Sequence, residues 1–358
     1  MSTTVRGPAI ASRVGTVLGI AIAVCFTTGL LSHWIQNPPG WFYWPAHPVW
    51  LYRVTQGAHV ITGVASVPLL LVKLWSVFPK LFERPIIKSP VHAAERGSIA
   101  ILVGAMIFEL VTGIQNAAQW YPWGFFFPPI HYAVAWVAVG ALLIHIAVKI
   151  PIIRDALGER QTDSRRRTVL RTAWIGAGVA AVAVAGQSIP ALRKVSVIAP
   201  RSGEGPQDLP VNRTAIAAGV TDTAQASDYQ LAVVSGDVAR AFTRIELQTM
   251  AQTKASLPIA CVEGWSASAN WEGVPIRSLL DSVGAPRGRD VRVTSLERGG
   301  LYRSTTLPAN FADDPITLVA LRLNGKVLDL DHGYPCRLIA PARPGVLQTK
   351  WLSRIEVL

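Results

Sequence analysis

Five apolar stretches, each about as long as a membrane-spanning helix, dominate the first half of this 358-residue chain. A helix that crosses the hydrocarbon core of a bilayer needs about 20 predominantly apolar residues. The stretches lie near residues 14–32, 55–78, 92–116, 130–150 and 172–190. Half of all residues are hydrophobic and only 16% are charged, which excludes a disordered chain. We therefore predict a membrane all-α bundle of five transmembrane helices, with the lipid bilayer as its partner.

The net charge of +12 lies almost entirely in this apolar half. Residues 1–194 carry 17 Lys and Arg against 6 Asp and Glu, whereas residues 195–358 carry 17 against 16. Basic residues beside apolar stretches are typical of membrane topology and not of nucleic-acid binding. They precede the first, third and fifth stretches, and the loops 33–54 and 117–129 contain only Arg53. The positive-inside rule then predicts a multi-pass cell-membrane protein with a cytoplasmic N-terminus, an extracytoplasmic C-terminal region and no nucleic-acid partner.

Two features near the membrane remain open to two interpretations each. The outer loops are rich in aromatic residues, which we interpret as an interfacial belt and, as a second possibility, as the lining of a quinone site. Residues 164–170, which read SRRRTVL, resemble a twin-arginine export signal, although a plain basic stop before a helix explains them equally. Residues 191–228 are rich in Pro, Gly and Ser and are predicted to be a linker and an irregular entry into the next domain.

From about Tyr229 the pattern changes to short alternating or apolar runs separated by Gly, Pro and Asx residues. The runs predicted to be strands are 231–234, 259–262, 291–296, 317–323, 337–340 and 355–358. Two stretches, near 244–253 and 275–284, have helical patterns. We therefore expect a β-rich α+β domain that is large enough for a core of its own.

Six of the seven histidines lie in the membrane half. His131 and His145 are fourteen residues apart, close to four helical turns, so both project from one face about 21 Å apart along the axis. That spacing suits two stacked haems. His59 lies level with His131 and has Gly63 one turn below, which makes His59 and His131 the predicted axial ligands of an outer haem. His92 lies at the depth of His145 and is its candidate partner.

Other interpretations of these polar residues stay open. Each histidine can instead form a hydrogen bond between helices. His33 is a rival to His59 for the outer iron, while His47, in a Pro-rich loop, is expected to be exposed. Glu109, in the middle of the third helix, either relays protons to a quinone or is paired inside the bundle.

The membrane half resembles the four-helix di-haem cytochrome b subunits of bacterial hydrogenases and related quinone-linked enzymes. The resemblance lies in residues 59–75, 91–92, 112–113 and 131–145. It implies haem b and electron exchange with the quinone pool. In that family the inner haem commonly uses a histidine near the cytoplasmic end of the first helix, which this sequence lacks. The inner haem is therefore either held with His92 or absent.

Cys261 follows the strand-like residues 257–260 and begins the sequence CVEGWS. A cysteine at a strand end can present a thiolate to a soft metal, although a lone cysteine is more often an apolar core residue. Further along come WEGVP from Trp271, HGYPCRL from His332 and the pair Lys350 and Trp351. Together these motifs resemble the molybdopterin domain of the sulfite oxidase family over about residues 210–358.

That resemblance implies a single pyranopterin dithiolene holding molybdenum, with Cys261 as the thiolate ligand. The residues implied to contact the pterin and its phosphate are Asn212, Ser295, His332, Arg337, Gln348, Thr349 and Lys350. Bacterial relatives often carry Asn at the position of His332, which weakens that assignment. Candidates for the substrate side are Tyr302, as a catalytic residue, Arg298 and Arg303, and Cys336 is expected to be a core residue.

The match runs to Leu358, which favours the short bacterial branch, best known for periplasmic methionine sulfoxide reductases that work with a separate haem-containing membrane subunit. Here both parts are fused. We expect a haem b-type membrane domain at 1–155, a fifth helix and linker at 156–200, and a molybdopterin domain at 201–358. The expected function is electron exchange between an extracytoplasmic small-molecule or sulfoxide-type substrate and the quinone pool through haem b. Alternatives are a molybdenum enzyme on a haem-free anchor and a cofactor-free binding protein.

Overall fold

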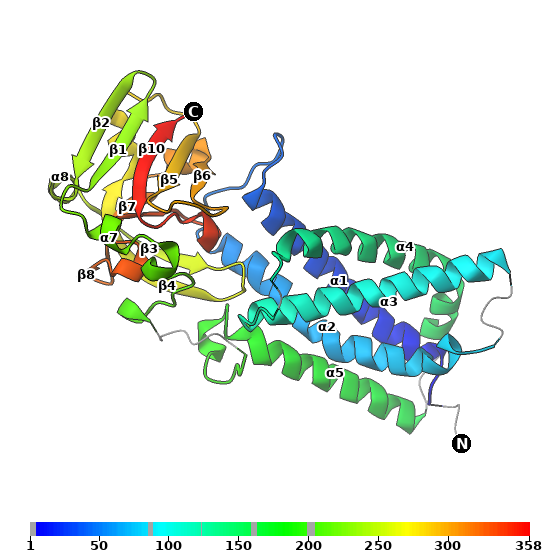
Figure 1. The fold of residues 1–358 in the computed structure, drawn as a ribbon. Helices are drawn as coiled ribbons and strands as arrows, with labels where there is room; N and C mark the ends of the chain where they lie inside the picture. The colour runs from blue at the N-terminus through cyan, green and yellow to red at the C-terminus, as the bar shows by residue number, and fades with distance from the viewer. Residues whose placement is uncertain (1–4, 85–88, 123, 159–162, 199–204) are drawn as a thin grey trace. The chain divides into compact units, whose positions relative to one another are not determined.

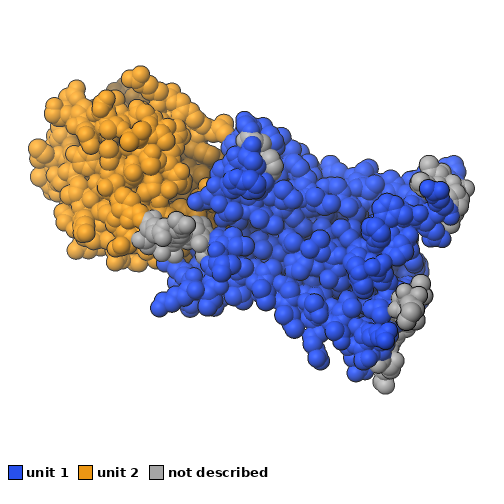
Figure 2. Space-filling view, turned by 60° about the horizontal axis from the view of Figure 1, so that its bottom comes forward, with its two compact units in different colours: residues 1–33, 55–200 blue, residues 34–54, 201–358 orange. Residues whose placement is uncertain are grey.

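The computed structural model describes the chain except for residues 1–4, 85–88, 123, 159–162 and 199–204 (Figure 1). The chain divides into two compact units (Figure 2). The helical unit contains residues 1–33 and 55–200, and the C-terminal unit contains residues 34–54 and 201–358. The segment 34–54, between the first two long helices, thus belongs to the C-terminal unit. Charge and hydropathy alone did not predict this.

Five long helices make up most of the helical unit. They are α1 (Pro8–Gln36), α2 (Leu51–Leu81), α3 (Pro90–Ala117), α4 (Pro128–Gly158) and α5 (Ser164–Ala185). Each is long and apolar enough to cross a membrane, which confirms the prediction of five apolar helices. Ser89 caps α3 and Asp163 caps α5, because each side chain accepts a hydrogen bond from a backbone N–H of the first turn.

The interior of the helical unit is formed by small and branched side chains. Ile10 and Val14 of α1 are fully buried, and Ala138 of α4 and Ala173 of α5 pack in the same cluster. Many large apolar side chains point outward instead, such as Leu143, which is 63% exposed. An apolar surface of this extent is expected of helices whose solvent is lipid.

Two five-stranded sheets form the C-terminal unit (Figure 1). The first has the order β2-β1-β10-β5-β6, and its strands are β1 (Gln230–Ser235), β2 (Val238–Thr243), β5 (Val291–Ser295), β6 (Ser304–Leu307) and β10 (Leu352–Val357). Only the β1–β10 pair in this sheet is parallel. The second has the order β3-β4-β7-β8 with β9 beside β7, and its strands are β3 (Thr253–Ala260), β4 (Ser266–Pro275), β7 (Leu318–Leu323), β8 (Lys326–Val327) and β9 (Arg337–Ile339). This arrangement confirms the β-rich domain.

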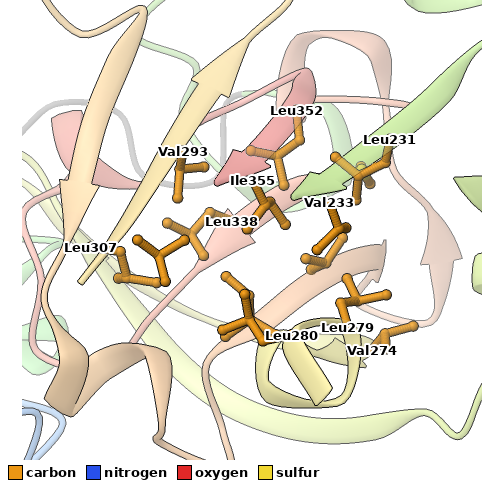
Figure 3. Packing of buried hydrophobic residues seen from close by; sticks show 14 of the residues in the cluster. Leu231, Val233, Val274, Leu279, Leu280, Val293, Leu307, Leu338, Leu352 and Ile355 are labelled. Carbon is orange, nitrogen blue, oxygen red and sulfur yellow. The ribbon is translucent and has the colours of Figure 1, made fainter. Parts of the chain in front are cut away.

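The main core of this unit lies between strands of both sheets and a short helix (Figure 3). Leu231 and Val233 of β1 point inward because side chains on a strand alternate between its two faces. Ile355 of β10 lies directly beside Val233 in the parallel ladder. Leu279 and Leu280 cover them from α9 (Ile276–Asp281). The remaining short helices are α6 (Ala215–Ala218), α7 (Thr221–Gln225), α8 (Arg244–Thr249) and α10 (Ala309–Ala312).

The predicted strands and the two predicted helices are all present, but the pattern missed β2, β4, β6 and β8. The helices α8 and α9 end earlier than predicted. In β4, Ala267, Ala269 and Trp271 are buried, whereas Ser268 is exposed. This is period-two alternation, but the small alanines give it little apolar contrast, and a hydropathy pattern does not detect such a strand.

Candidate functional site

Cys261 lies in a tight turn between β3 and β4. Its backbone N–H donates to the carbonyl of Trp265 at 2.8 Å, and Gly264 donates back to the Cys261 carbonyl at 3.0 Å. Gly264 has a φ of 102°, a conformation that glycine adopts without steric cost. The cysteine is therefore held at the end of β3, as the sequence predicted, by a turn that pairs Ala260 with Ser266.

The environment of the Cys261 thiol favours its protonated form. The residue is only 2% exposed, and its sulfur lies 3.5 Å from Oε2 of Glu263. Trp265 donates from Nε1 to the same carboxylate oxygen at 3.0 Å. Burial, followed by the charge of Glu263, raises the pKa of Cys261 well above its usual value. A bound cation is needed to make this sulfur a thiolate at neutral pH.

The 340–345 loop packs directly on this turn. Pro344 forms an isolated bridge with Ala260. Gly345 approaches so closely that a Cβ placed on it would lie 3.6 Å from the Cα of Cys261. The turn and the loop are therefore adjacent walls of one site.

Two cations of the C-terminal unit, one buried and one half-buried, have backbone carbonyls as partners. Arg337 is 2% exposed and donates to the carbonyls of His332 at 3.0 Å and Gln348 at 3.1 Å. Lys350 donates from Nζ to the carbonyls of Asp331 at 2.7 Å and Arg213 at 3.0 Å. Burial lowers the pKa of Arg337 to about 9, and burial together with the Arg337 charge lowers that of Lys350 to about 7. Neutral acceptors compensate a buried cation poorly, so both side chains would be stabilised by an anion.

A buried hydrogen-bond donor of Arg337 also lacks an acceptor in the described part of the chain, which again favours a bound anion. Within the described residues Nε of Arg337 has no hydrogen-bond partner although it is buried. The guanidinium lies over the ring of Trp271, 5.1 Å from its centroid. The charge of Cys261 also affects the pKa values of Lys350 and Tyr302, which places the thiol near both. The residues present therefore fit an anionic cofactor with a soft metal.

The other predicted pterin contacts surround these cations. His332 is 1% exposed, and its Nε2 lies 2.6 Å from the carbonyl of Pro206. Burial lowers the pKa of His332 to about 4, so the ring is neutral at physiological pH. Ser295 donates from Oγ to the Lys350 carbonyl at 2.9 Å, and Asn212 is exposed one residue before Arg213. The structure thus gathers Ser295, His332 and Asn212 around Lys350.

Gln348 and Thr349 are buried but engaged within the fold. The Gln348 amide exchanges two hydrogen bonds with the backbone of Ala340, at 2.8 and 2.7 Å. The Thr349 hydroxyl lies 3.2 Å from that of Thr305. Both side chains therefore shape the site, and the Gln348 carbonyl, not its amide, contacts Arg337.

The substrate-side candidates differ in exposure. Tyr302 is 37% exposed and donates from its hydroxyl to Oε1 of Gln36 at 3.0 Å. Partial burial, and then the charge of Cys261, raises its pKa. Arg298 and Arg303 are both exposed. Tyr302 is thus the candidate with a defined place beside the thiol.

Sequence reasoning missed Arg343, because its setting, PARPG, looks like an ordinary turn. Arg343 is 3% exposed, donates from Nη2 to the carbonyl of Thr306, and has no described partner at Nη1. Burial lowers its pKa to about 9. Nothing in the turn pattern indicates that this arginine is buried.

Three side assignments can be compared with the structure. His47 was expected to be simply exposed, but its Nε2 lies 2.7 Å from Oδ2 of the buried Asp314, although 57% of the side chain is exposed. Trp44 packs against the core of the C-terminal unit, so the interpretation as an interfacial belt was wrong for this residue. Cys336 is fully buried, as expected, and its sulfur lies 3.1 Å from the Tyr229 hydroxyl.

In the helical unit, His59 of α2 and His131 of α4 face each other. Their ring centroids are 6.4 Å apart. Two imidazoles bound to one iron would have centroids about 6 Å apart, given metal–nitrogen bonds of about 2 Å. A Cβ on Gly29 would lie 2.8 Å from Cε1 of His59, and one on Gly113 would lie 4.0 Å from Cε1 of His131. The distance between the rings is thus close to that of two imidazoles on one iron, and the ring of His59 packs directly on the backbone of Gly29.

Both histidines already have hydrogen-bond partners. Nδ1 of His59 lies 2.8 Å from the carbonyl of Cys25. Nδ1 of His131 lies 2.8 Å from the Thr112 hydroxyl, and its Nε2 lies 3.0 Å from Oε2 of Glu109. The Glu109 carboxylate would have to move before Nε2 of His131 could bind iron. His33, the rival ligand, stacks on Tyr132 with centroids 3.7 Å apart.

His92 and His145 line a cavity of about 2170 Å³ in the helical unit, together with Lys73 and an ion pair between Lys149 and Glu95. The described residues do not contain a cluster of three or more His, Cys, Asp or Glu side chains able to hold a metal ion. A haem iron with two axial histidines and a pterin-held metal with one thiolate both need fewer protein ligands.

Comparisons with known proteins agree with the geometry of the C-terminal unit. Residues 217–358 match the family model described as the oxidoreductase molybdopterin binding domain. Sulfite oxidase from Arabidopsis thaliana is 33% identical over 113 residues, which are 26% of this chain and 29% of that protein. A putative protein-methionine-sulfoxide reductase subunit YedZ1 from Azospira oryzae is 32% identical over 126 residues, 35% of this chain and 47% of the relative.

Among solved structures, the sulfane dehydrogenase SoxCD from Paracoccus pantotrophus is 24% identical with a TM-score of 0.33, covering 36% of this chain and 38% of that one. The chain spans less than half the length of each of these three proteins. Residues 217–358 of the C-terminal region are thus similar to the oxidoreductase domains that bind molybdopterin.

Proposed function

We propose that the protein is a membrane-bound molybdenum–pterin oxidoreductase that exchanges electrons between an extracytoplasmic, sulfoxide-type substrate and the quinone pool through haem b. The observation that carries the proposal is that the matched region 217–358 contains the buried Cys261 thiol, the buried guanidinium of Arg337 and the half-buried ammonium of Lys350. The relative named as a sulfoxide reductase subunit supports the substrate class. The five apolar helices and the distribution of basic residues support the membrane location and topology.

The chain's own residues account for cofactor binding. Arg337 offers a buried, partly unsatisfied guanidinium to a phosphate, and Lys350 offers a point charge. An anion beside Lys350 restores its protonated form, which burial disfavours. The hydroxyl of Ser295 and the neutral ring of His332 complete a polar lining without adding charge.

A molybdenum centre bound there would supply oxygen-atom or two-electron chemistry. Cys261 loses its proton when its sulfur becomes a ligand, and Oε2 of Glu263, 3.5 Å away, is placed to accept it. The turn around Cys261 keeps water from the sulfur. Tyr302 stays protonated at neutral pH because its pKa is raised, and its single hydroxyl proton is donated to Oε1 of Gln36, so a substrate oxygen would have to replace Gln36 as the acceptor.

In the helical unit the proposed haem ligands are His59 and His131. A hydrogen bond from Nδ1 of His59 to the Cys25 carbonyl selects the tautomer that leaves Nε2 available for iron. Glycine at position 29 lets the ring of His59 pack against α1, because a Cβ there would lie 2.8 Å from Cε1 of His59. For the second haem we propose His145 with His92, because both line the same cavity.

A second candidate is the same molybdenum enzyme on an anchor without haem. One observation favours it, namely that both ring nitrogens of His131 are already within hydrogen-bond distance of Thr112 and Glu109. In this case the helices position the C-terminal domain at the membrane and a different protein carries the electrons.

Metal and haem quantification on the full-length protein in detergent tests the proposal. We expect molybdenum near one atom per chain and a b-type band in the reduced-minus-oxidised spectrum. Molybdenum without a b-type band supports the haem-free anchor. Absence of molybdenum after expression with ample molybdate contradicts both. A screen of sulfoxides, N-oxides and sulfite, with quinol or quinone as the partner, then identifies the substrate class.

A further inference from the structure

The segment 34–54, which includes the end of α1, the loop after it and the start of α2, is more than a connection between helices. It is anchored in the C-terminal unit by Ala46, which is buried in the main core, and by Val49, which packs against the second cluster. The contact of Nε2 of His47 with Oδ2 of Asp314, at 2.7 Å, fixes it at a third point. Three other residues of the segment, Gln36, Trp44 and Arg53, contact Tyr302, the 340–345 loop and the start of β4, respectively.

Arg53 contacts the strand that leaves the Cys261 turn. Its Nε donates to Oγ of Ser266 at 2.7 Å, and its Nη2 donates to Oγ of Ser268 at 2.6 Å. Ser266 pairs with Ala260 across the base of the turn. The planar guanidinium therefore holds the hydroxyls of the buried Ser266 and the exposed Ser268, on the same face of β4, in a fixed geometry that a lysine would not reproduce.

Trp44 contacts the second wall of the site. Its Nε1 donates to the carbonyl of Ala342 at 2.8 Å, and Asn310 donates back to the Trp44 carbonyl at 3.0 Å. Ala342 has a φ of 48°, a left-handed conformation that costs energy in a residue with a Cβ. A hydrogen bond to its carbonyl helps to keep the 340–345 loop against Cys261.

Gln36 contacts the substrate-side candidate. Its Oε1 accepts the hydroxyl proton of Tyr302 at 3.0 Å. This hydrogen bond orients a phenol that is otherwise 37% exposed and free to adopt other rotamers.

We propose that Gln36, Trp44 and Arg53 form a clasp that completes the molybdenum site. The clasp positions the segment that carries Tyr302, the 340–345 loop and the start of β4. The inference rests on the proposed function. It makes the segment between two helices of the membrane region part of the enzyme's active-site architecture, and the three residues are positioning residues, since none of them touches the thiol. Active sites tolerate little displacement, and an error of about 1 Å can reduce a rate about 100-fold.

The test uses the full-length protein in detergent and four variants. Trp44→Phe removes the indole N–H donor, and Gln36→Leu removes the acceptor for Tyr302. Arg53→Lys keeps the positive charge but loses the planar guanidinium that donates to two serine hydroxyls at once. The fourth variant combines Trp44→Phe, Arg53→Leu and Gln36→Leu. The matched control is Trp41→Phe, in the same segment, because Trp41 is 70% exposed. The measurements are molybdenum content, the Mo(V) electron paramagnetic resonance spectrum, and kcat and KM with dimethyl sulfoxide as the probe.

We expect molybdenum content to stay near that of the wild type in the single variants. The combined variant should lower kcat about 10- to 100-fold with a smaller change in KM, and should shift the Mo(V) spectrum. Arg53→Lys should fall between the wild type and the combined variant, and Trp41→Phe should match the wild type.

A combined variant with wild-type kcat and an unchanged Mo(V) spectrum overturns the clasp and leaves the segment as a tether. If the combined variant does not fold, the same comparison is made with Trp44→Phe and Arg53→Lys, and wild-type values in both overturn the clasp. A wild-type protein without molybdenum refutes the proposed function itself, so the two failures are distinguishable.

Discussion

The two proposed cofactor sites differ in how their polar groups are balanced. In the C-terminal unit, Arg337 is buried and Lys350 half-buried, both donate to backbone carbonyls, and burial lowers the pKa of both even though the charges of Asp331 and Glu297 act on Lys350. In the helical unit, His59 and His131 have hydrogen-bond partners at their rings. The first site therefore has a charge imbalance that an anion would correct. The second is internally satisfied, and a haem must displace at least the contact between His131 and Glu109.

The largest effect is expected from Cys261→Ser. Loss of the thiolate should lower molybdenum-dependent turnover by more than about 100-fold. Loss of a residue that only hydrogen-bonds to a metal ligand already costs about 10- to 100-fold, and loss of the ligand itself should cost more. The b-type haem spectrum should be unchanged, because the substitution lies in the other compact unit. Turnover assays and difference spectra on the same preparation check this. Wild-type turnover in this variant would refute the ligand assignment.

His131→Ala tests the other half of the comparison. We expect the spectrum of the outer haem to disappear, because His131 is the proposed partner of His59 and the centroids of the two rings are 6.4 Å apart. Molybdenum content should not change. The control is His47→Ala, which removes a histidine that lies outside the helical unit. If the spectrum persists in His131→Ala, another residue is the ligand and the spacing of the pair has a purely structural origin.

Arg337→Met tests whether the charge imbalance serves the cofactor. Hydrogen bonds to charged groups contribute about 1.5–3 kcal/mol, so retention of the pterin should fall about 10- to 100-fold. The cofactor-free variant should be no less stable to heat than the cofactor-free wild type, because a buried cation with a lowered pKa is replaced by an apolar side chain of similar length. A large loss of thermal stability without loss of pterin would mean that Arg337 serves the fold.

The smallest effect concerns pH and Lys350. Its pKa of about 7 means that the cofactor-free site loses this positive charge as the pH rises through 7. Binding of an anion requires the protonated form, so affinity should be constant below that pH and fall above it, by up to about tenfold per pH unit for one linked proton. Sulfate is the probe, because its own charge does not change over this range.

The neighbouring His332 and Arg337 do not change their charge within the pH range of this measurement. The pKa values of His332, about 4, and Arg337, about 9, lie outside the range from pH 6 to 8. Isothermal titration of the cofactor-free protein at several pH values gives the dependence. Lys350→Met should bind sulfate more weakly and without pH dependence in this range. The same pH dependence in that variant would exclude Lys350 as its source.

Much of the fold followed from hydropathy and charge. The five apolar helices were predictable because a run of about 20 apolar residues has few alternatives to a membrane helix. Cys261 at the end of β3 was predictable because an apolar run stops there and a Gly-containing turn follows. The pairing of His59 with His131 was predicted from helical geometry, and the structure places their rings together.

Other features could not be predicted because they depend on contacts between distant parts of the chain. Arg53 looks like a single basic residue in an outer loop, and only the fold brings it to Ser266 and Ser268. Arg343 lies in a turn-like sequence, yet it is buried. Glu109 was assigned two roles, and the structure places its carboxylate on His131. Sequence spacing describes one element at a time and does not report which loops meet.

X-ray absorption at the molybdenum edge of the full-length protein tests the central claim most directly, because it counts the sulfur atoms bound to the metal. The account predicts that the wild type has one more sulfur ligand than the Cys261→Ser variant prepared with the same cofactor. An equal sulfur count in the two proteins would contradict it, because Cys261 would then not be the residue that holds the metal.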